Sequence, residues 1–288
     1  MSTVLRLRAH ELPEALTGAD APRAVVDELL WQEVADNDAA LSRRAIGGWR
    51  LHGNIGDDLT LLYGEHSGGG MLVPTTGLRA VRGAALTAAA ARMFVGPQVV
   101  TVSVLGSGLA ARLQILALAT HVPGVSHVAV HAPDGRSRVP SSLVEWLDGA
   151  GIGLTVAKCG ADAVFGANLV VLAGPQPRAS WQLPQGAVIV NATGHEVPLD
   201  ARVDQVFVDD RRLLPGSAPG TADLGQVLAG THPGRDALDG VLFVDLLGTD
   251  AGGLWLTHQL YQAALRNGLG VPAGALPGTD GYQGGMWP

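Results

Sequence analysis

A glycine-rich hexapeptide, Gly106-Ser107-Gly108-Leu109-Ala110-Ala111, has the residue types and spacing with which a backbone holds a pyrophosphate. The first glycine permits a tight turn, the second lets the backbone approach phosphate oxygens, and a small third residue lets a helix pack on a strand. A helix N-terminus at this place supplies N–H donors and a partial positive charge. We therefore predict that residues 106–110 bind a dinucleotide. An ordinary tight turn and a methyltransferase loop for S-adenosylmethionine are the alternatives.

The adenosine ribose of a dinucleotide binds at the end of the second strand, where this chain carries His131 and then Arg136 and Arg138. An acidic residue directly at that strand end would favour NAD, and none stands there. The two arginines suit a 2′-phosphate, which favours NADP, although solvated loop arginines explain them equally well. The cofactor is thus NADP(H) or NAD(H). We also assign the ends of two later strands, Ala173 and Asn191, to its site.

The elements that must position these residues follow from the apolar pattern. Residues 99–105 form a near-continuous apolar run, typical of a buried parallel strand, and residues 109–120 have the pattern of the following helix. Ser142 and Glu145 have capping-box spacing and predict the start of another helix. Because parallel neighbours need a crossover, short strands separated by helices predict a doubly wound parallel sheet. The further strands are expected at residues 128–130, 154–157, 169–173, 188–191, 206–209 and 241–245.

The flanking segments carry different patterns. Asp20, as a cap, and Pro22, in the first turn, predict a helix that runs towards residue 40. Short strands are expected at residues 60–63 and 71–74, followed by an alanine-rich helix at residues 78–94. Near the other end, residues 256–267 are amphipathic and stop at Gly268, as a helix does.

Residues 77–85 place an arginine in a helix ahead of small residues, residues 104–118 hold the strand, glycine turn and helix, and residues 222–235 read ADLGQVLAGTHPGR. These stretches, with residues 183–191, resemble the ornithine cyclodeaminase/mu-crystallin family of nicotinamide-dependent proteins over roughly residues 58–268. The resemblance implies an α/β fold: a Rossmann-type doubly wound parallel sheet and a second, smaller split α+β domain. The Rossmann domain would cover residues 99–245. Residues 1–98 plus 246–288 would bind substrate and form a homodimer.

The resemblance also assigns roles to two arginines. Arg82 matches the arginine that binds the substrate carboxylate in this family, and a guanidinium suits that role because it binds carboxylates bidentately. Arg50 is assigned to the same substrate pocket, with His52 and Asn54 beside it. A surface arginine paired with a helix neighbour is the alternative for Arg82.

The chain departs from the family at its catalytic positions. Family cyclodeaminases use a lysine in the N-terminal region, whereas the single lysine here is Lys158. They also use an aspartate after the strand that corresponds to residues 188–191, where this chain reads Ala-Thr-Gly-His-Glu. His195 in that stretch can donate a proton and is, with Arg82, our catalytic candidate; a solvent-exposed loop histidine is the alternative. No group of residues has metal-ligand spacing, so we predict no metal.

Three functions are consistent with these residues. The first is an NAD(P)H-dependent oxidoreductase that reduces an imine of a small carboxylate-bearing substrate in a biosynthetic pathway. The second is a nicotinamide-binding protein without catalysis, which the missing family residues favour. The third is a true amino-acid cyclodeaminase, which needs a base that the sequence does not reveal.

Composition excludes other partners. The chain of 288 residues has a net charge of −7 and scattered basic residues, so we expect no nucleic-acid partner. It lacks a long apolar run and an apolar N-terminal core, so we expect no membrane span and a cytoplasmic location. The single cysteine, Cys159, excludes an internal disulfide, and we expect a buried, unreactive thiol.

Overall fold

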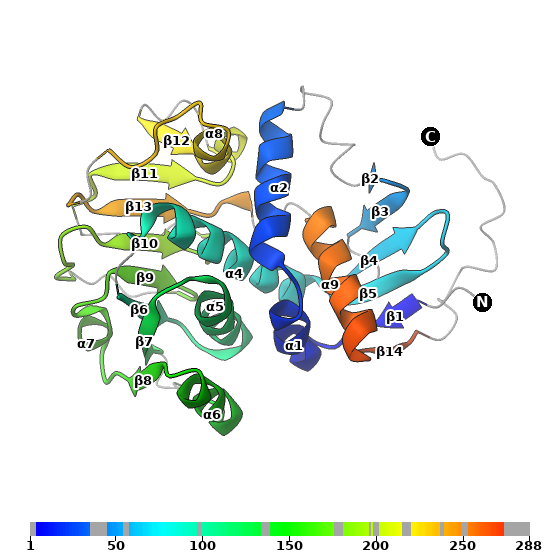
Figure 1. Cartoon of the computed structure of the whole chain (residues 1–288), viewed down its shortest axis with the longest axis horizontal. Coiled ribbons are helices and arrows are strands. Elements are labelled where there is room, and N and C mark those ends of the chain that lie inside the picture. The colour runs from blue at the N-terminus through cyan, green and yellow to red at the C-terminus, as the bar shows by residue number, and fades with distance from the viewer. Residues whose placement is uncertain are drawn as a thin grey trace.

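The computed structural model describes residues 4–34, 45–53, 58–96, 99–133, 139–175, 181–195, 197, 202–214, 220–236, 239–248 and 253–273. Two lobes, each built on one sheet, lie side by side (Figure 1). Helix α2 (Ala21–Val34) stands between them and contacts elements of both. Within these ranges, no helix combines the length and the hydrophobicity that a membrane crossing requires.

The larger lobe contains eight parallel strands in the order β12-β11-β13-β10-β9-β6-β7-β8. Its central strands are buried along their whole length, which explains their continuous apolar runs. The Rossmann-type fold predicted from the sequence is therefore confirmed. The strands are β6 (Val100–Leu105), β7 (Val125–His131), β8 (Gly153–Val156), β9 (Leu169–Leu172), β10 (Val188–Asn191), β11 (Gln205–Val208), β12 (Thr221–Asp223) and β13 (Leu242–Asp245).

Helices connect and cover these strands. Helix α5 (Gly108–His121) follows β6 and packs against the long alanine-rich helix α4 (Thr75–Phe94), whose small side chains allow close contact. Helix α4 starts in the smaller lobe and extends along the sheet of the larger one (Figure 1). The remaining helices of this lobe are α6 (Ser141–Gly149), α7 (Gly160–Val164), α8 (Leu224–Leu228) and the 3₁₀ turn η2 (Arg211–Leu213).

The smaller lobe is a six-stranded sheet in the order β14-β1-β5-β4-β3-β2. Strand β1 (Val4–Arg6) pairs with β14 (Val271–Pro272), so segments from both ends of the described chain share this sheet (Figure 1). Leu62 and Met71 lie on its buried face, where α1 (Leu12–Thr17) and α9 (Leu254–Asn267) complete the core. The other elements are η1 (Ala9–Glu11), β2 (Ala45–Ile46), β3 (Trp49–His52), β4 (Leu59–Gly64) and β5 (Gly70–Pro74).

Two local predictions were wrong. Helix α6 starts at Ser141 behind Pro140 and has no side-chain cap, so Ser142 lies inside the first turn and the capping box with Glu145 does not form. Cys159 is exposed, because it follows the solvent-facing edge strand β8. Its sulfur accepts the N–H of Asp162 at 3.4 Å and caps α7.

Candidate functional site

The glycine loop joins the carboxyl ends of three neighbouring strands. Gly106 has a φ of 155°, and a Cβ there would lie 2.8 Å from the carbonyl carbon of Ala173 at the end of β9. Its N–H donates to the His131 carbonyl oxygen at the end of β7, at 2.9 Å. Only glycine fits this turn without displacing backbone. The structure thus brings together Gly106, His131 and Ala173, three of the residues assigned to the cofactor site.

Gly108 differs from Gly106, because its surroundings are open. It has a φ of 68°, and a Cβ at this position would have nothing within 4 Å among the described residues. The first turn of the 14-residue helix α5 begins here, with Leu109 and Ala110 half-buried behind Ser107 and Gly108. An open glycine at a helix N-terminus fits the pyrophosphate of a dinucleotide. Arg136, expected at the ribose, lies outside the described residues.

Asn191 organises the loop after β10. Its buried side-chain amide donates to the Asp245 carboxylate at 2.7 Å and to the His195 carbonyl oxygen at 2.8 Å. Its Oδ1 accepts the N–H and the hydroxyl of Thr193, at 3.1 and 2.7 Å. These four bonds use the whole hydrogen-bonding capacity of the amide. Asn191 therefore orders the loop in which the exposed His195 lies, at the carboxyl edge of the sheet.

Arg82 is buried where α4, α2 and the segment after β13 meet. Helix α4 passes the end of β10, because a Cβ on the adjacent Gly83 would lie 3.6 Å from the Ala192 carbonyl oxygen. The Arg82 Nη1 atom donates to Glu28 Oε2 at 2.8 Å, and Nε donates to the Gly248 carbonyl oxygen at 3.2 Å. Burial lowers the pKa of Arg82, but the contact with Glu28 reverses the effect and leaves the pKa raised.

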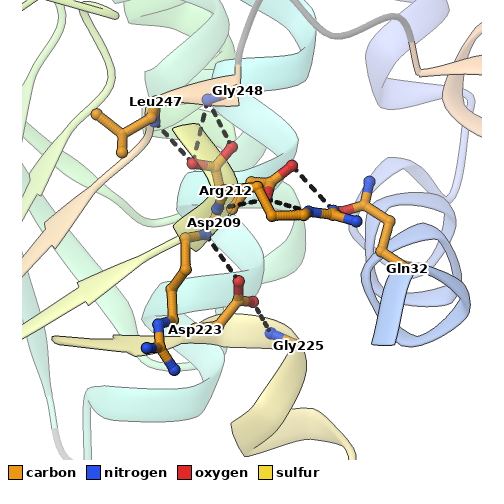
Figure 2. Close-up of polar contacts among 9 residues, drawn as sticks. Gln32, Asp209, Arg212, Asp223, Gly225, Leu247 and Gly248 are labelled. Carbon is orange, nitrogen blue, oxygen red and sulfur yellow. Dashed lines mark hydrogen bonds and ion pairs between the residues drawn. The ribbon is translucent and has the colours of Figure 1, made fainter. Parts of the chain in front are cut away.

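A cluster of carboxylates lies at the ends of β11 and β12 (Figure 2). The peptide of Gly248 links this cluster to Arg82. Asp209 accepts the N–H groups of Leu247 at 2.7 Å and Gly248 at 2.9 Å. Burial raises its pKa to about 6, although Arg82 acts in the opposite direction. Asp223 caps α8 by accepting the Gly225 N–H at 2.8 Å.

The neighbouring Asp210 forms an ion pair with Arg212. Its carboxylate accepts from Arg212 Nε at 2.7 Å, and Arg212 also reaches Gln32 on α2 at 3.4 Å (Figure 2). The cluster thus ties the edge of the large sheet to α2. Within the described ranges, no three His, Cys, Asp or Glu residues are grouped so as to hold a metal ion. We missed Glu28 and Asp209 at the sequence level, although two acids directly after the apolar strand at residues 206–208 were a usable signal.

Arg50 lies elsewhere. It is on β3, half-exposed, and forms an ion pair with Glu65. Among the contacts of the described residues, none joins Arg50 to Arg82. His52 is exposed at the end of the same strand, and Asn54 lies outside the described residues.

A cavity of about 340 Å³ lies between α2, the β2–β3 turn and α9. The cavity lies close to the buried ion pair of Arg82 and Glu28. Its lining residue Asp27 directly precedes Glu28. Its lining residue Leu254 directly follows Gly253, and a Cβ on Gly253 would lie 2.8 Å from Arg82 Nη1. Burial lowers the pKa of His258 in its wall. The charged and aromatic side chains in the wall of the cavity are Asp20, Arg23, Asp27, Trp49, Trp255 and His258.

The fold and glycine loop define a dinucleotide-binding α/β protein with a second lobe. A sequence model of the ornithine cyclodeaminase/mu-crystallin family matches residues 58–205, and the chain belongs to this family, as predicted. No curated protein sequence matches the chain.

Solved structures share the architecture at low sequence identity. CmnK has a TM-score of 0.70 and 20% identity, covering 96% of this chain and 99% of its own. An archaeal alanine dehydrogenase dimer with bound NAD has a TM-score of 0.65 and 16% sequence identity, and the match covers 95% of this chain and 99% of that chain. The Δ¹-pyrroline-2-carboxylate reductase of Thermococcus litoralis, in complex with NADH and L-proline, has a TM-score of 0.63 and 14% sequence identity. The match covers 93% of this chain and 100% of that chain. These likenesses extend over both lobes.

Proposed function

We propose that this protein is an NAD(P)H-dependent oxidoreductase that reduces the C=N bond of a small molecule. The observation that carries the proposal is the glycine loop, where Gly106 closes against the ends of β7 and β9 and Gly108 leaves the N-terminus of α5 open. Family membership supports it. So do an alanine dehydrogenase with NAD and a pyrroline carboxylate reductase with NADH among the similar structures, because both reactions interconvert amine and imine carbons.

The chain's own residues take distinct roles in this proposal. The residues that would hold the pyrophosphate run from Gly106 to Ala110, and a bound nicotinamide supplies a hydride to the substrate carbon. Asn191 fixes the loop that carries His195 beside the strand ends, and His195 is the proposed proton donor. Arg82 lies buried on α4, where its Nε donates to the Gly248 carbonyl oxygen after β13, the strand next to β10.

The direct test is oxidation of NADH and NADPH, followed by absorbance, with cyclic imines such as 1-pyrroline and 1-pyrroline-2-carboxylate. We expect steady turnover with one of them and none without an imine. Tight cofactor binding without any turnover would contradict the proposal and favour a binding protein, an alternative that the pairing of Arg82 with Glu28 supports. Ammonia release from a diamino acid without net cofactor turnover would identify a cyclodeaminase.

We further propose a homodimer in the cytoplasm, acting in a biosynthetic pathway on a small-molecule substrate, with residues 1–98 plus 246–288 as its dimerisation domain. The dimer is supported by the face of the small sheet that points away from α1 and α9. Leu61 and Tyr63 lie on it, opposite the buried Leu62, and Tyr63 is 37% exposed. His52 and Arg50 of β3 lie directly opposite them, so this face combines apolar and polar side chains, as subunit interfaces do.

A further inference from the structure

Both arginines assigned to a substrate carboxylate already hold a carboxylate of the chain itself. Arg82 pairs with Glu28, and Arg50 pairs with Glu65. We propose that Glu28 is a specificity-determining residue: it occupies the carboxylate position on Arg82, so that the substrate is an imine without a free carboxylate beside the reacting carbon. This inference rests on the proposed imine reduction and narrows its substrate class.

Burial makes Glu28 hard to displace. Arg82 is 3% exposed and Glu28 is 4% exposed, and their charged atoms are 2.8 Å apart. A substrate carboxylate that took the Nη1 position would break the buried ion pair between Arg82 and Glu28, and breaking a buried ion pair is strongly destabilising. The surroundings are also tight, because a Cβ on Gly253 would lie 2.8 Å from Arg82 Nη1 and 3.3 Å from Glu28 Oε2.

The charge around Arg82 favours a cationic substrate. Two carboxylates share this one guanidinium: Glu28 in direct contact, and Asp209 through the peptide of Gly248. Such a field repels a further carboxylate and stabilises a protonated imine. A protonated imine accepts hydride at carbon, the C=N π electrons become the nitrogen lone pair, and a neutral amine leaves while the nicotinamide is oxidised.

The first experiment compares 1-pyrroline with 1-pyrroline-2-carboxylate, which differ only in the carboxylate. With the wild type, we expect kcat/KM for 1-pyrroline to exceed that for the carboxylate at least tenfold. Glu28→Gln retains an oxygen acceptor for Arg82 but removes the charge, so its preference should shift at least tenfold towards the carboxylate. Glu33→Gln, an exposed position on the same helix, is the matched control and should leave the preference unchanged. A wild type that prefers the carboxylate overturns the inference.

A binding experiment keeps the inference separate from the proposed function. L-proline is titrated calorimetrically into each protein with NADH present, and NADH binding is measured on its own. We expect Glu28→Gln to bind L-proline at least tenfold more tightly than the wild type, and the double variant Glu28→Gln/Arg82→Gln to lose that gain. Equal affinity of wild type and Glu28→Gln overturns the inference. Absence of turnover with every imine refutes imine reduction, while the titration still decides the role of Glu28. If Glu28→Gln does not fold, the two measurements on the wild type decide. A preference for 1-pyrroline together with a Kd for L-proline above the millimolar range supports the inference. A preference for the carboxylate together with tighter binding of L-proline overturns it.

Discussion

Asp209 accepts the N–H of Gly248 at 2.9 Å, and the carbonyl oxygen of the same Gly248 accepts from Arg82 Nε at 3.2 Å. One peptide segment after β13 thus connects the buried carboxylate of Asp209 with the buried guanidinium of Arg82. Figure 2 shows the bonds from this segment to Asp209. Because Arg82 also holds Glu28, the end of β11, the segment after β13 and α2 are linked through charged groups. The ionisation of Asp209 is therefore coupled to the geometry around Arg82.

The first prediction concerns the pH dependence of stability. Burial raises the pKa of Asp209 from 3.8 to about 6, so the folded state holds this proton more tightly than the unfolded state. The stability that this proton contributes is fully present well below the unfolded pKa of 3.8 and is lost as the pH rises through about 6. Relative to Asp209→Asn, the wild type should lose roughly 2.5 kcal/mol of unfolding free energy between pH 4 and pH 7. Urea unfolding at several pH values measures the difference.

The control for Asp209 is Asp236→Asn, an exposed position in the same lobe, which should follow the wild-type pH profile. If Asp209→Asn and the wild type lose stability in parallel from pH 4 to pH 7, Asp209 does not carry the shifted proton.

Local sequence signals were sufficient for the central strands of the large lobe. The runs at residues 99–105, 169–173 and 188–191 became β6, β9 and β10 because buried parallel strands need apolar side chains on both faces. The glycine loop was predictable for a similar reason, since φ values such as 155° at Gly106 restrict the residue type.

The partners of the site residues were not predictable. Glu28 and Arg82 are 54 positions apart, and only the packing of α2 on α4 brings them together. Short strands such as β12 and β14 carry too few residues to show a period, and pairing with β11 and β1 defines them. Cys159 shows the converse error, because an apolar strand next to it was interpreted as buried although β8 is an edge strand.

The second prediction tests the phosphate loop. Gly108→Asp places a carboxylate at the open N-terminus of α5, and like charges about 4 Å apart repel by about 4 kcal/mol near a protein surface. We expect calorimetric titration to show no binding of NADH or NADPH while the fold survives. Gly151→Asp is the matched control, because Gly151 has a φ of 72° and equally open surroundings between α6 and β8. Unchanged affinity in Gly108→Asp would remove the loop from the cofactor site.

The third prediction separates the two cofactors. If Arg136 and Arg138 hold a 2′-phosphate, replacing both by alanine removes charge-assisted hydrogen bonds worth roughly 1.5–3 kcal/mol each. NADPH should then bind more than tenfold more weakly, with NADH little affected. Equal losses for both cofactors would contradict the 2′-phosphate assignment.

The fourth prediction concerns assembly. Light scattering at micromolar concentration should give twice the chain mass, and Leu61→Asp should give the monomer, because it introduces a charge on the second face of the small sheet. Val144→Asp places the same charge on a 41% exposed residue of α6 and should leave the mass unchanged. A monomeric wild type would contradict the proposed dimer.

The last prediction is that the protein does not convert ornithine to proline. Cyclodeamination removes a hydride from an amine-bearing carbon, closes a ring with loss of ammonia and returns the hydride, so it needs a base beside that carbon. The single lysine, Lys158, follows β8 at one edge of the sheet. Strand β13, after which Gly248 contacts Arg82, lies towards the other edge. Arginine does not serve as the base, because it stays protonated.

The same geometry argues against binding of the substrate. The ornithine carboxylate would compete with Glu28 for Arg82, and the buried pair resists that exchange. Mass spectrometry of reactions with ornithine and NAD⁺ should therefore show neither proline nor ammonia, in a preparation that reduces 1-pyrroline. Sustained formation of proline would mean that another group, such as His195, acts as the base and that Arg82 accepts a substrate carboxylate despite Glu28.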